Sequence, residues 1–135
     1  MGSRNCGEYK TMSYKWDSKK PTAQMLGRWQ PFHDGHYALF EEIIKKTGQV
    51  SIQVRDVQGV DDNPFDFDQI KKKIEERLTP KYVNKFKVVL VPNITNICYG
   101  RGVGYKIEEI VLPESIQKIS ATNIRKDMRT KGELK

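Results

Sequence analysis

Cysteine and histidine are scarce in this chain of 135 residues, and long apolar runs are absent. The two cysteines, Cys6 and Cys98, cannot form a disulfide framework, so a reducing, cytoplasmic location is the simplest expectation. No stretch approaches the roughly 18 consecutive apolar residues of a membrane-spanning helix, and the polar residues 1–20 contain no signal-peptide core. Neither a membrane protein nor a small secreted domain held by disulfides is therefore expected.

Length and net charge indicate the size of the fold and the kind of partner that the protein binds. The length suits one domain with its own core, and we expect a flexible leader at residues 1–20 followed by the folded domain at residues 21–135. The net charge is +7, from 24 Lys and Arg against 17 Asp and Glu. This excess favours an anionic partner: a phosphorylated small molecule, a nucleic acid or an acidic membrane surface.

Hydrophobic patterning predicts alternating strands and helices. Three strands are predicted first and two weaker ones follow them: 22–28, 50–54, 86–91, 94–99 and 109–112. The third is almost continuously apolar, as in an interior strand of a parallel sheet. Helices are predicted over residues 35–47, over residues 67–78 and from residue 120 onward. This order predicts an α/β fold, a single Rossmann-like domain whose parallel sheet has helices on both faces.

The predicted helix ends carry suitable capping residues. Asp34 and Asp66 are candidate N-caps, Gly48 suits the C-terminal end of the first helix, and Pro80 is expected to follow the second. Ligands of open parallel sheets bind beyond the carboxyl ends of the strands. The turn after the first strand and the start of the last helix should therefore meet at one edge.

Both histidines of the chain lie in one turn, in the sequence His33-Asp34-Gly35-His36. The helix that begins there directs free N–H groups and the positive end of its dipole at this turn. Imidazoles in such a place can donate hydrogen bonds to phosphate oxygens and stabilise charge in a transition state. Two histidines without a third ligand nearby make a poor zinc site, so no metal site is predicted. A pair of purely structural histidines is the other alternative.

Two segments at opposite ends of the chain resemble signatures of one superfamily. The sequence Gly27-Arg28-Trp29-Gln30-Pro31-Phe32-His33-Asp34-Gly35-His36 resembles the GRFQPFHxGH signature of the HxGH nucleotidyltransferases. Ile119-Ser120-Ala121-Thr122-Asn123-Ile124-Arg125 resembles their ISxTxIR signature. Asn63-Pro64-Phe65 is similar to a short motif of the archaeal-type nicotinamide-mononucleotide adenylyltransferases. The resemblance covers roughly residues 22–130.

This resemblance implies a modified Rossmann fold and a nucleotidyl transfer reaction. A phosphate or phosphonate group of a small acceptor attacks the α-phosphorus of a nucleoside triphosphate, and pyrophosphate leaves. Members of the superfamily use Mg²⁺ and form no covalent enzyme intermediate. Many are dimers or larger, so the resemblance implies a homodimer or a larger homo-oligomer.

The resemblance also implies roles for particular residues. His33 and His36 would hold the α-phosphate and stabilise the transition state, and Arg125 would bind the neighbouring phosphates. Nucleotide-binding roles are implied for other residues of the two signatures: Gly27, Arg28, Gln30, Phe32, Gly35, Ser120, Thr122, Asn123 and Ile124. Further candidates for substrate contacts are Arg55, Asp56 and Arg101. Trp29 and Phe32 are expected to pack into the core.

The sequence leaves the substrates open. The residues before His33 and the Asn63-Pro64-Phe65 motif favour ATP and adenylyl transfer. The short run between the last predicted strand and Ile119 is instead similar to glycerol-phosphate cytidylyltransferases, which favours CTP. A non-catalytic basic domain that binds nucleotides or nucleic acid is the alternative function, through the basic residues at the end of the chain. No RRM, KH or zinc-finger signature is present, which argues against nucleic acid.

Overall fold

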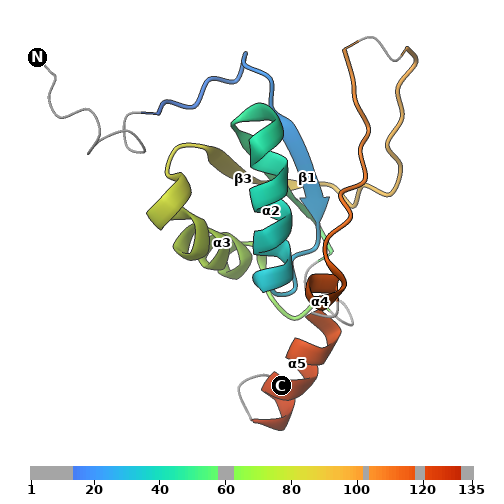
Figure 1. The fold of residues 1–135 in the computed structure, drawn as a ribbon. Helices are drawn as coiled ribbons and strands as arrows, with labels where there is room; N and C mark the ends of the chain where they lie inside the picture. Colours follow the sequence, from blue (N-terminus) through green and yellow to red (C-terminus); the bar gives the residue numbers. More distant parts are fainter. Residues whose placement is uncertain (1–13, 58–62, 102–103, 118–120, 132–135) are drawn as a thin grey trace, which may run out of the picture.

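The computed structural model of the protein describes residues 14–57, 63–101, 104–117 and 121–131. Three strands, β1 (Ala23–Gly27), β2 (Val50–Arg55) and β3 (Phe86–Val91), form a parallel sheet in the order β1-β2-β3. Helix α2 (Asp34–Thr47) joins β1 to β2, and α3 (Phe67–Tyr82) joins β2 to β3 (Figure 1). The α/β class, its parallel sheet and the three principal strands are thereby confirmed.

One face of the sheet carries the core. Met25, Ile52 and Val88 lie in register on the three strands, and all three are buried. The helices add further buried side chains: Phe40, Ile43 and Ile44 from α2, and Ile70, Ile74 and Leu78 from α3. Both helices lie on this face (Figure 1), because right-handed crossovers between strands in chain order put successive helices on the same side. The sequence predicted helices on both faces of the sheet, and α2 and α3 both lie on the same one.

Local hydrogen bonds define the ends of α2. His33, and not the predicted Asp34, is the N-cap, because the His33 side chain accepts hydrogen bonds from the N–H groups of Gly35 and His36. Asp34 is instead the first helical residue. At the other end Gly48 takes the left-handed φ of 84° expected of a C-terminal glycine, and its N–H donates to the carbonyl of Ile44.

Helix α3 begins as predicted and ends later. Asp66 caps it and exchanges side-chain hydrogen bonds with Gln69. The helix continues to Tyr82, so the prediction that it ends before Pro80 is wrong. Pro80 sits in the last turn, where a missing N–H removes a single bond of the helix. The Tyr82 hydroxyl anchors this turn by donating to Glu41 of α2 at 2.7 Å.

The segment that follows β3 departs most from the prediction. The strands predicted over 94–99 and 109–112 do not form. Both segments belong to an irregular arm, residues 92–101 and 104–113, which projects from the sheet before α4 (Glu114–Gln117) (Figure 1). A strand needs a partner for its backbone N–H and C=O groups, and an alternating pattern does not supply one. Ile97 and Tyr99 of the arm are accordingly 60% and 53% exposed.

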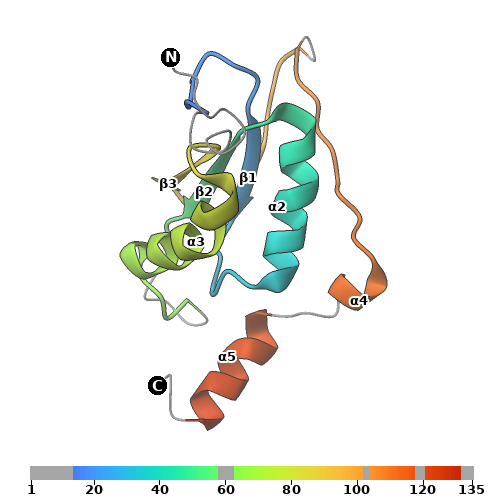
Figure 2. The same ribbon diagram turned by 60° about the vertical axis from the view of Figure 1, so that its left-hand side comes forward.

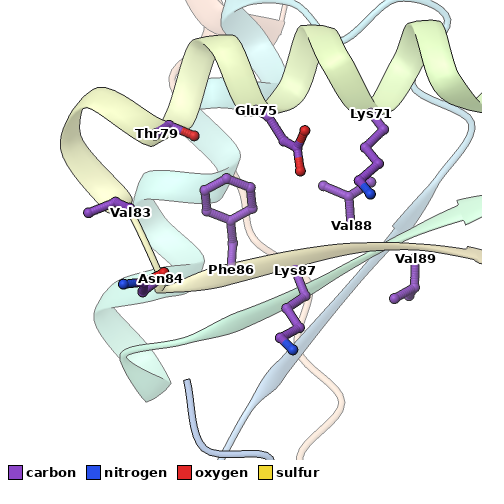
Figure 3. A pocket seen from close by; sticks show the side chains of 9 residues that line it. All are labelled: Lys71, Glu75, Thr79, Val83, Asn84, Phe86, Lys87, Val88 and Val89. Atoms are coloured by element: carbon purple, nitrogen blue, oxygen red, sulfur yellow. The ribbon is translucent and has the colours of Figure 1, made fainter. Parts of the chain in front are cut away.

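Strand β3 was expected in the interior of the sheet from its apolar sequence, and that expectation is wrong for the described residues, where β3 is an edge strand. Figure 3 shows a hollow between this edge and α3. Its lining residues are Lys71, Glu75, Thr79, Val83, Asn84, Phe86, Lys87, Val88 and Val89. None of them belongs to either signature, so the hollow is separate from the site predicted from the sequence.

The buried amide of Gln49 ties the amino ends of the strands to residues 14–22. Gln49 precedes β2 and is fully buried. Its Nε2 donates to the carbonyl of Asp17 at 2.7 Å and to Oγ1 of Thr22 at 2.6 Å. Its Oε1 accepts from the hydroxyl of Tyr14 at 2.9 Å. Residues 14–17 of the predicted leader thus contact the domain, and the boundary at residue 21 stays a prediction.

Candidate active site

The turn after β1 lies at the carboxyl end of the sheet, where open parallel α/β folds bind their ligands. Residues 28–33 lead from β1 into α2. Helix α5 (Ala121–Thr130), which confirms the last predicted helix, lies at the same end of the molecule, as does the short α4, which the sequence did not predict (Figure 2). The fold therefore brings the two signatures together from opposite ends of the chain.

The two histidines cap α2 together. Nδ1 of His33 accepts from the N–H groups of Gly35 and His36 at 3.0 and 3.4 Å. Nδ1 of His36 in turn accepts from the N–H of His33 at 3.2 Å. The two rings stack with their centroids 3.7 Å apart and their planes within 16°. Sequence reasoning found both residues but missed this reciprocal capping, because aspartate is the more usual N-cap.

These hydrogen bonds define the tautomer of both rings. A neutral imidazole has one nitrogen that accepts and one that carries a proton. Because Nδ1 accepts from the backbone in each ring, the proton must lie on Nε2. The turn therefore offers two N–H donors at the N-terminus of a helix, where the dipole favours an anion.

The surroundings keep the imidazoles neutral. Burial and, as the smaller cause, the neighbouring His33 together lower the pKa of His36 from 6.5 to about 3. Burial also lowers the pKa of His33, although the carboxylate of Asp34 opposes this. At neutral pH both rings are therefore uncharged donors.

Trp29 packs the turn into the core, as predicted. Its side chain is 5% exposed, its Nε1 donates to the carbonyl of Gln53 at 3.1 Å, and its ring meets the ring of His36 edge-on at 4.7 Å. Trp29 has a left-handed φ of 54°, which is uncommon for a residue with a side chain. Gly27 makes room for it, because a Cβ there would lie 2.8 Å from the indole ring.

Phe32 and Gly35 shape the other side of the histidine pair. Phe32 is 3% exposed and its ring lies 5.5 Å from that of His36, so the predicted core packing is confirmed. A Cβ at Gly35 would lie 2.8 Å from Cε1 of His33. Glycine at this position therefore allows the His33 ring to fold back over the helix end.

Gln30 joins the turn to the Asn63-Pro64-Phe65 segment. Its Nε2 donates to the carbonyl of Phe65 at 2.8 Å, and its Oε1 accepts from the N–H of Phe65 at 2.9 Å. Beside it, Nη1 of Arg28 donates to Oδ1 of Asn63 at 3.2 Å. The resemblance pointed to these positions, but the partners could be found only from the structure.

Arg125 links the second signature to the first. It is 1% exposed, and its Nη1 donates to the main-chain carbonyl of Gln30. On the same helix Asn123 is exposed, Ile124 is half-buried and Thr122 lies in the first turn. Ser120 lies outside the described residues.

The remaining candidates lie farther along the chain. Arg55 and Asp56 lie at the carboxyl end of β2, where Nη2 of Arg55 donates to Oδ1 of Asn93 at 2.8 Å. Arg101 is exposed and belongs to the irregular arm between β3 and α4. The structure thus brings Arg55 and Asp56 to the ligand edge of the sheet, and the role of Arg101 stays a prediction.

Comparison with known proteins gives one partial match to report. No protein-family model matches the sequence. A nicotinamide-nucleotide adenylyltransferase of Methanococcus aeolicus is 40% identical to this chain over 45 residues. The match covers 32% of this chain and 26% of that protein, so the chain spans about a quarter of the relative's length. The likeness indicates a nucleotidyltransferase-like relationship at this coarse level.

Proposed function

We propose that this chain is a nucleotidyltransferase, which transfers AMP or CMP from a nucleoside triphosphate to a phosphorylated small molecule and releases pyrophosphate. The observation that carries the proposal is the stacked pair of neutral histidines at the N-terminus of α2. The fold class and the partial adenylyltransferase relative support the same class of reaction.

The proposed reaction needs charge neutralisation and positioning more than bond-making by the protein. A phosphate oxygen of the acceptor forms a bond to the α-phosphorus, and the bond from that phosphorus to the bridging oxygen of pyrophosphate breaks. The Nε2–H groups of His33 and His36 would donate to the non-bridging α-phosphate oxygens, on which negative charge gathers. The dipole of α2 would act in the same direction.

The second signature would bind the leaving pyrophosphate. Thr122 lies in the first turn of α5, and with Ser120 it would offer hydroxyl groups to the pyrophosphate. The phosphate contact of Arg125 stays part of the proposal, in addition to its hydrogen bond to Gln30. Arg28, Arg55 and Asp56 are proposed to contact the substrates at the neighbouring edge of the sheet.

Mg²⁺ is proposed to arrive with the triphosphate. Within the described ranges, no group of three His, Cys, Asp or Glu side chains could hold a metal ion. Mg²⁺ commonly binds through phosphate oxygens and water with few protein ligands, which suits this donor set. Bound there, Mg²⁺ would neutralise charge on the phosphates.

Pyrophosphate release with Mg²⁺ tests the proposal. ATP and CTP are each combined with nicotinamide mononucleotide, glycerol phosphate, phosphocholine and a simple phosphonate. The partial relative makes ATP with nicotinamide mononucleotide the first pair to try. Release with one pair identifies the base and the acceptor together. Saturable nucleotide binding without release from any pair contradicts the enzyme and favours the non-catalytic binding domain.

Two substitutions of one histidine separate its two nitrogen atoms. In His36→Asn the amide oxygen can replace Nδ1 as the acceptor for the cap, but the Nε2–H donor is lost. His36→Gln places an N–H donor near the position of Nε2. We expect His36→Asn to lower kcat about a hundredfold, and His36→Gln to lower it less. Equal kcat in His36→Asn and the wild type would contradict the proposed role.

A further inference from the structure

Three segments meet at one buried residue, Gln30. The residue lies in the turn before the histidines and is 2% exposed. Its amide makes two hydrogen bonds to the backbone of Phe65, at 2.8 and 2.9 Å. Its own main-chain carbonyl accepts from the guanidinium of Arg125 on α5. The turn, the 63–65 segment and α5 are thus joined through a single residue.

The burial of Gln30 argues against direct contact with a ligand. Gln30 is 2% exposed, and its Nε2 and Oε1 each already bond to Phe65, so a nucleotide has little access to its amide. Both bonds are partly buried, so losing the amide leaves the N–H and C=O of Phe65 without their partner where access of water is reduced. The amide therefore has a strong effect on where the 63–65 segment lies.

We propose that Gln30 is a positioning residue: its side-chain amide holds the 63–65 segment, and its main-chain carbonyl holds α5, in register with the histidine turn. This inference rests on the proposed function, since the histidine turn and α5 contain residues that are proposed to bind the triphosphate. The resemblance implied that Gln30 contacts the nucleotide directly. We propose instead that Gln30 acts by positioning its neighbours. The same hydrogen bonds position Arg28 indirectly, because its partner Asn63 belongs to the segment that Gln30 holds.

The chain contains a matched control in Gln49. Like Gln30, it is a glutamine with a fully buried amide and paired Nε2 and Oε1 atoms. Unlike Gln30, it precedes β2 and lies at the amino end of the sheet, away from the histidine turn. Replacing either glutamine by methionine removes the same groups and keeps a similar volume. A difference in kcat between the two variants then comes from where the glutamine lies in the fold, and not from the general cost of burying unpaired polar groups.

The first experiment compares Gln30→Met with Gln49→Met in the full chain. Hydrogen exchange of the Phe65 amide, which donates to Gln30, should become at least about tenfold faster in Gln30→Met only. In the pyrophosphate assay, Gln30→Met should lower kcat about tenfold or more, whereas Gln49→Met should leave kcat near that of the wild type. Unchanged exchange at Phe65, or equal loss of kcat in both variants, overturns the inference.

A second variant covers the case in which Gln30→Met does not fold. In Gln30→Glu, a carboxylate keeps an acceptor for the Phe65 N–H but faces the Phe65 carbonyl with no proton to donate. Protonation of the introduced carboxyl at lower pH restores a donor. We expect the exchange rate of the Phe65 amide in Gln30→Glu, divided by the wild-type rate at the same pH, to fall toward one as the pH is lowered. A pH profile of exchange parallel to that of the wild type contradicts the inference.

The outcomes separate this inference from the proposed function. Absence of pyrophosphate release from the wild-type chain with every substrate pair argues against the proposed function alone, because the exchange of the Phe65 amide is measured without substrates. An active wild-type chain in which Gln30→Met behaves like Gln49→Met rejects the positioning role alone.

Discussion

At the scale of single residues, the same nitrogen atoms serve folding and the proposed chemistry. Nδ1 of His33 and Nδ1 of His36 accept the backbone N–H groups that begin α2. Protonation of either Nδ1 would break its capping bonds, so the helix end favours the neutral rings. The tautomer that caps the helix is also the one that presents Nε2–H donors. The histidine pair therefore needs no titration at neutral pH to be ready for a phosphate.

This arrangement predicts a pH-dependent stability. The pKa of His36 is about 3 in the folded chain, against 6.5 as its ordinary value. Between these values the unfolded chain binds a proton that the folded chain does not, so stability is complete above pH 6.5 and falls as the pH drops toward 3. One such group makes the free energy of unfolding about 2 kcal/mol smaller at pH 5 than at pH 7. Urea denaturation at the two pH values measures this difference.

His36→Asn is the control for that measurement. The chain contains two histidines, and few other side chains titrate between pH 5 and 7. The lowered pKa of His33 adds to the effect in the same direction. Removing the His36 imidazole should therefore leave a smaller difference between pH 5 and pH 7. The same difference in the variant as in the wild type would show that the effect comes from another group.

At the scale of elements, the junction of β1 with the histidine turn depends on one glycine. Gly27→Ala places a Cβ 2.8 Å from the Trp29 ring, so the ring or the strand must move. We expect the free energy of unfolding to fall by about 1–3 kcal/mol, as for other overpacked sites. Because the same ring packs against His36, kcat should fall as well. Urea denaturation and the pyrophosphate assay give the two readouts.

Gly100→Ala is the matched substitution in the arm. A Cβ at Gly100 meets nothing within 4 Å. Losing a glycine there should leave stability unchanged or raise it slightly, through the entropy of the unfolded chain. Equal effects of the two substitutions would mean that contact with Trp29 does not limit position 27.

The elements also reveal what could be read from the sequence. The three strands of the sheet, the Asp66 cap and the Gly48 cap were predictable because each depends on residues close together in the chain. The strands predicted over 94–99 and 109–112 failed because pairing depends on a neighbouring strand that the pattern does not contain. The edge position of β3 was missed for the same reason. For the candidate site, the residues were predictable from the signatures, but the bonds of Gln30 to Phe65 and Arg125 were not.

At the scale of the whole molecule, Arg125 connects the two ends of the described chain. Its hydrogen bond to Gln30 spans 95 positions of sequence. Arg125→Lys keeps the positive charge but loses the planar guanidinium. We expect this variant to loosen α5, with about tenfold faster hydrogen exchange in the helix in the absence of nucleotide. Hydrogen exchange followed peptide by peptide makes the measurement.

Arg129→Lys supplies the comparison, since Arg129 lies on the same helix and is exposed. Hydrogen exchange of α5 in Arg129→Lys should match that in the wild type. Working without nucleotide separates the docking of α5 from the proposed phosphate contact of Arg125, which can act only when a triphosphate is bound. If both lysine variants exchange like the wild type, the buried guanidinium is not what holds α5 against the histidine turn. Faster exchange in Arg125→Lys alone would mean that α5 is positioned before any ligand arrives.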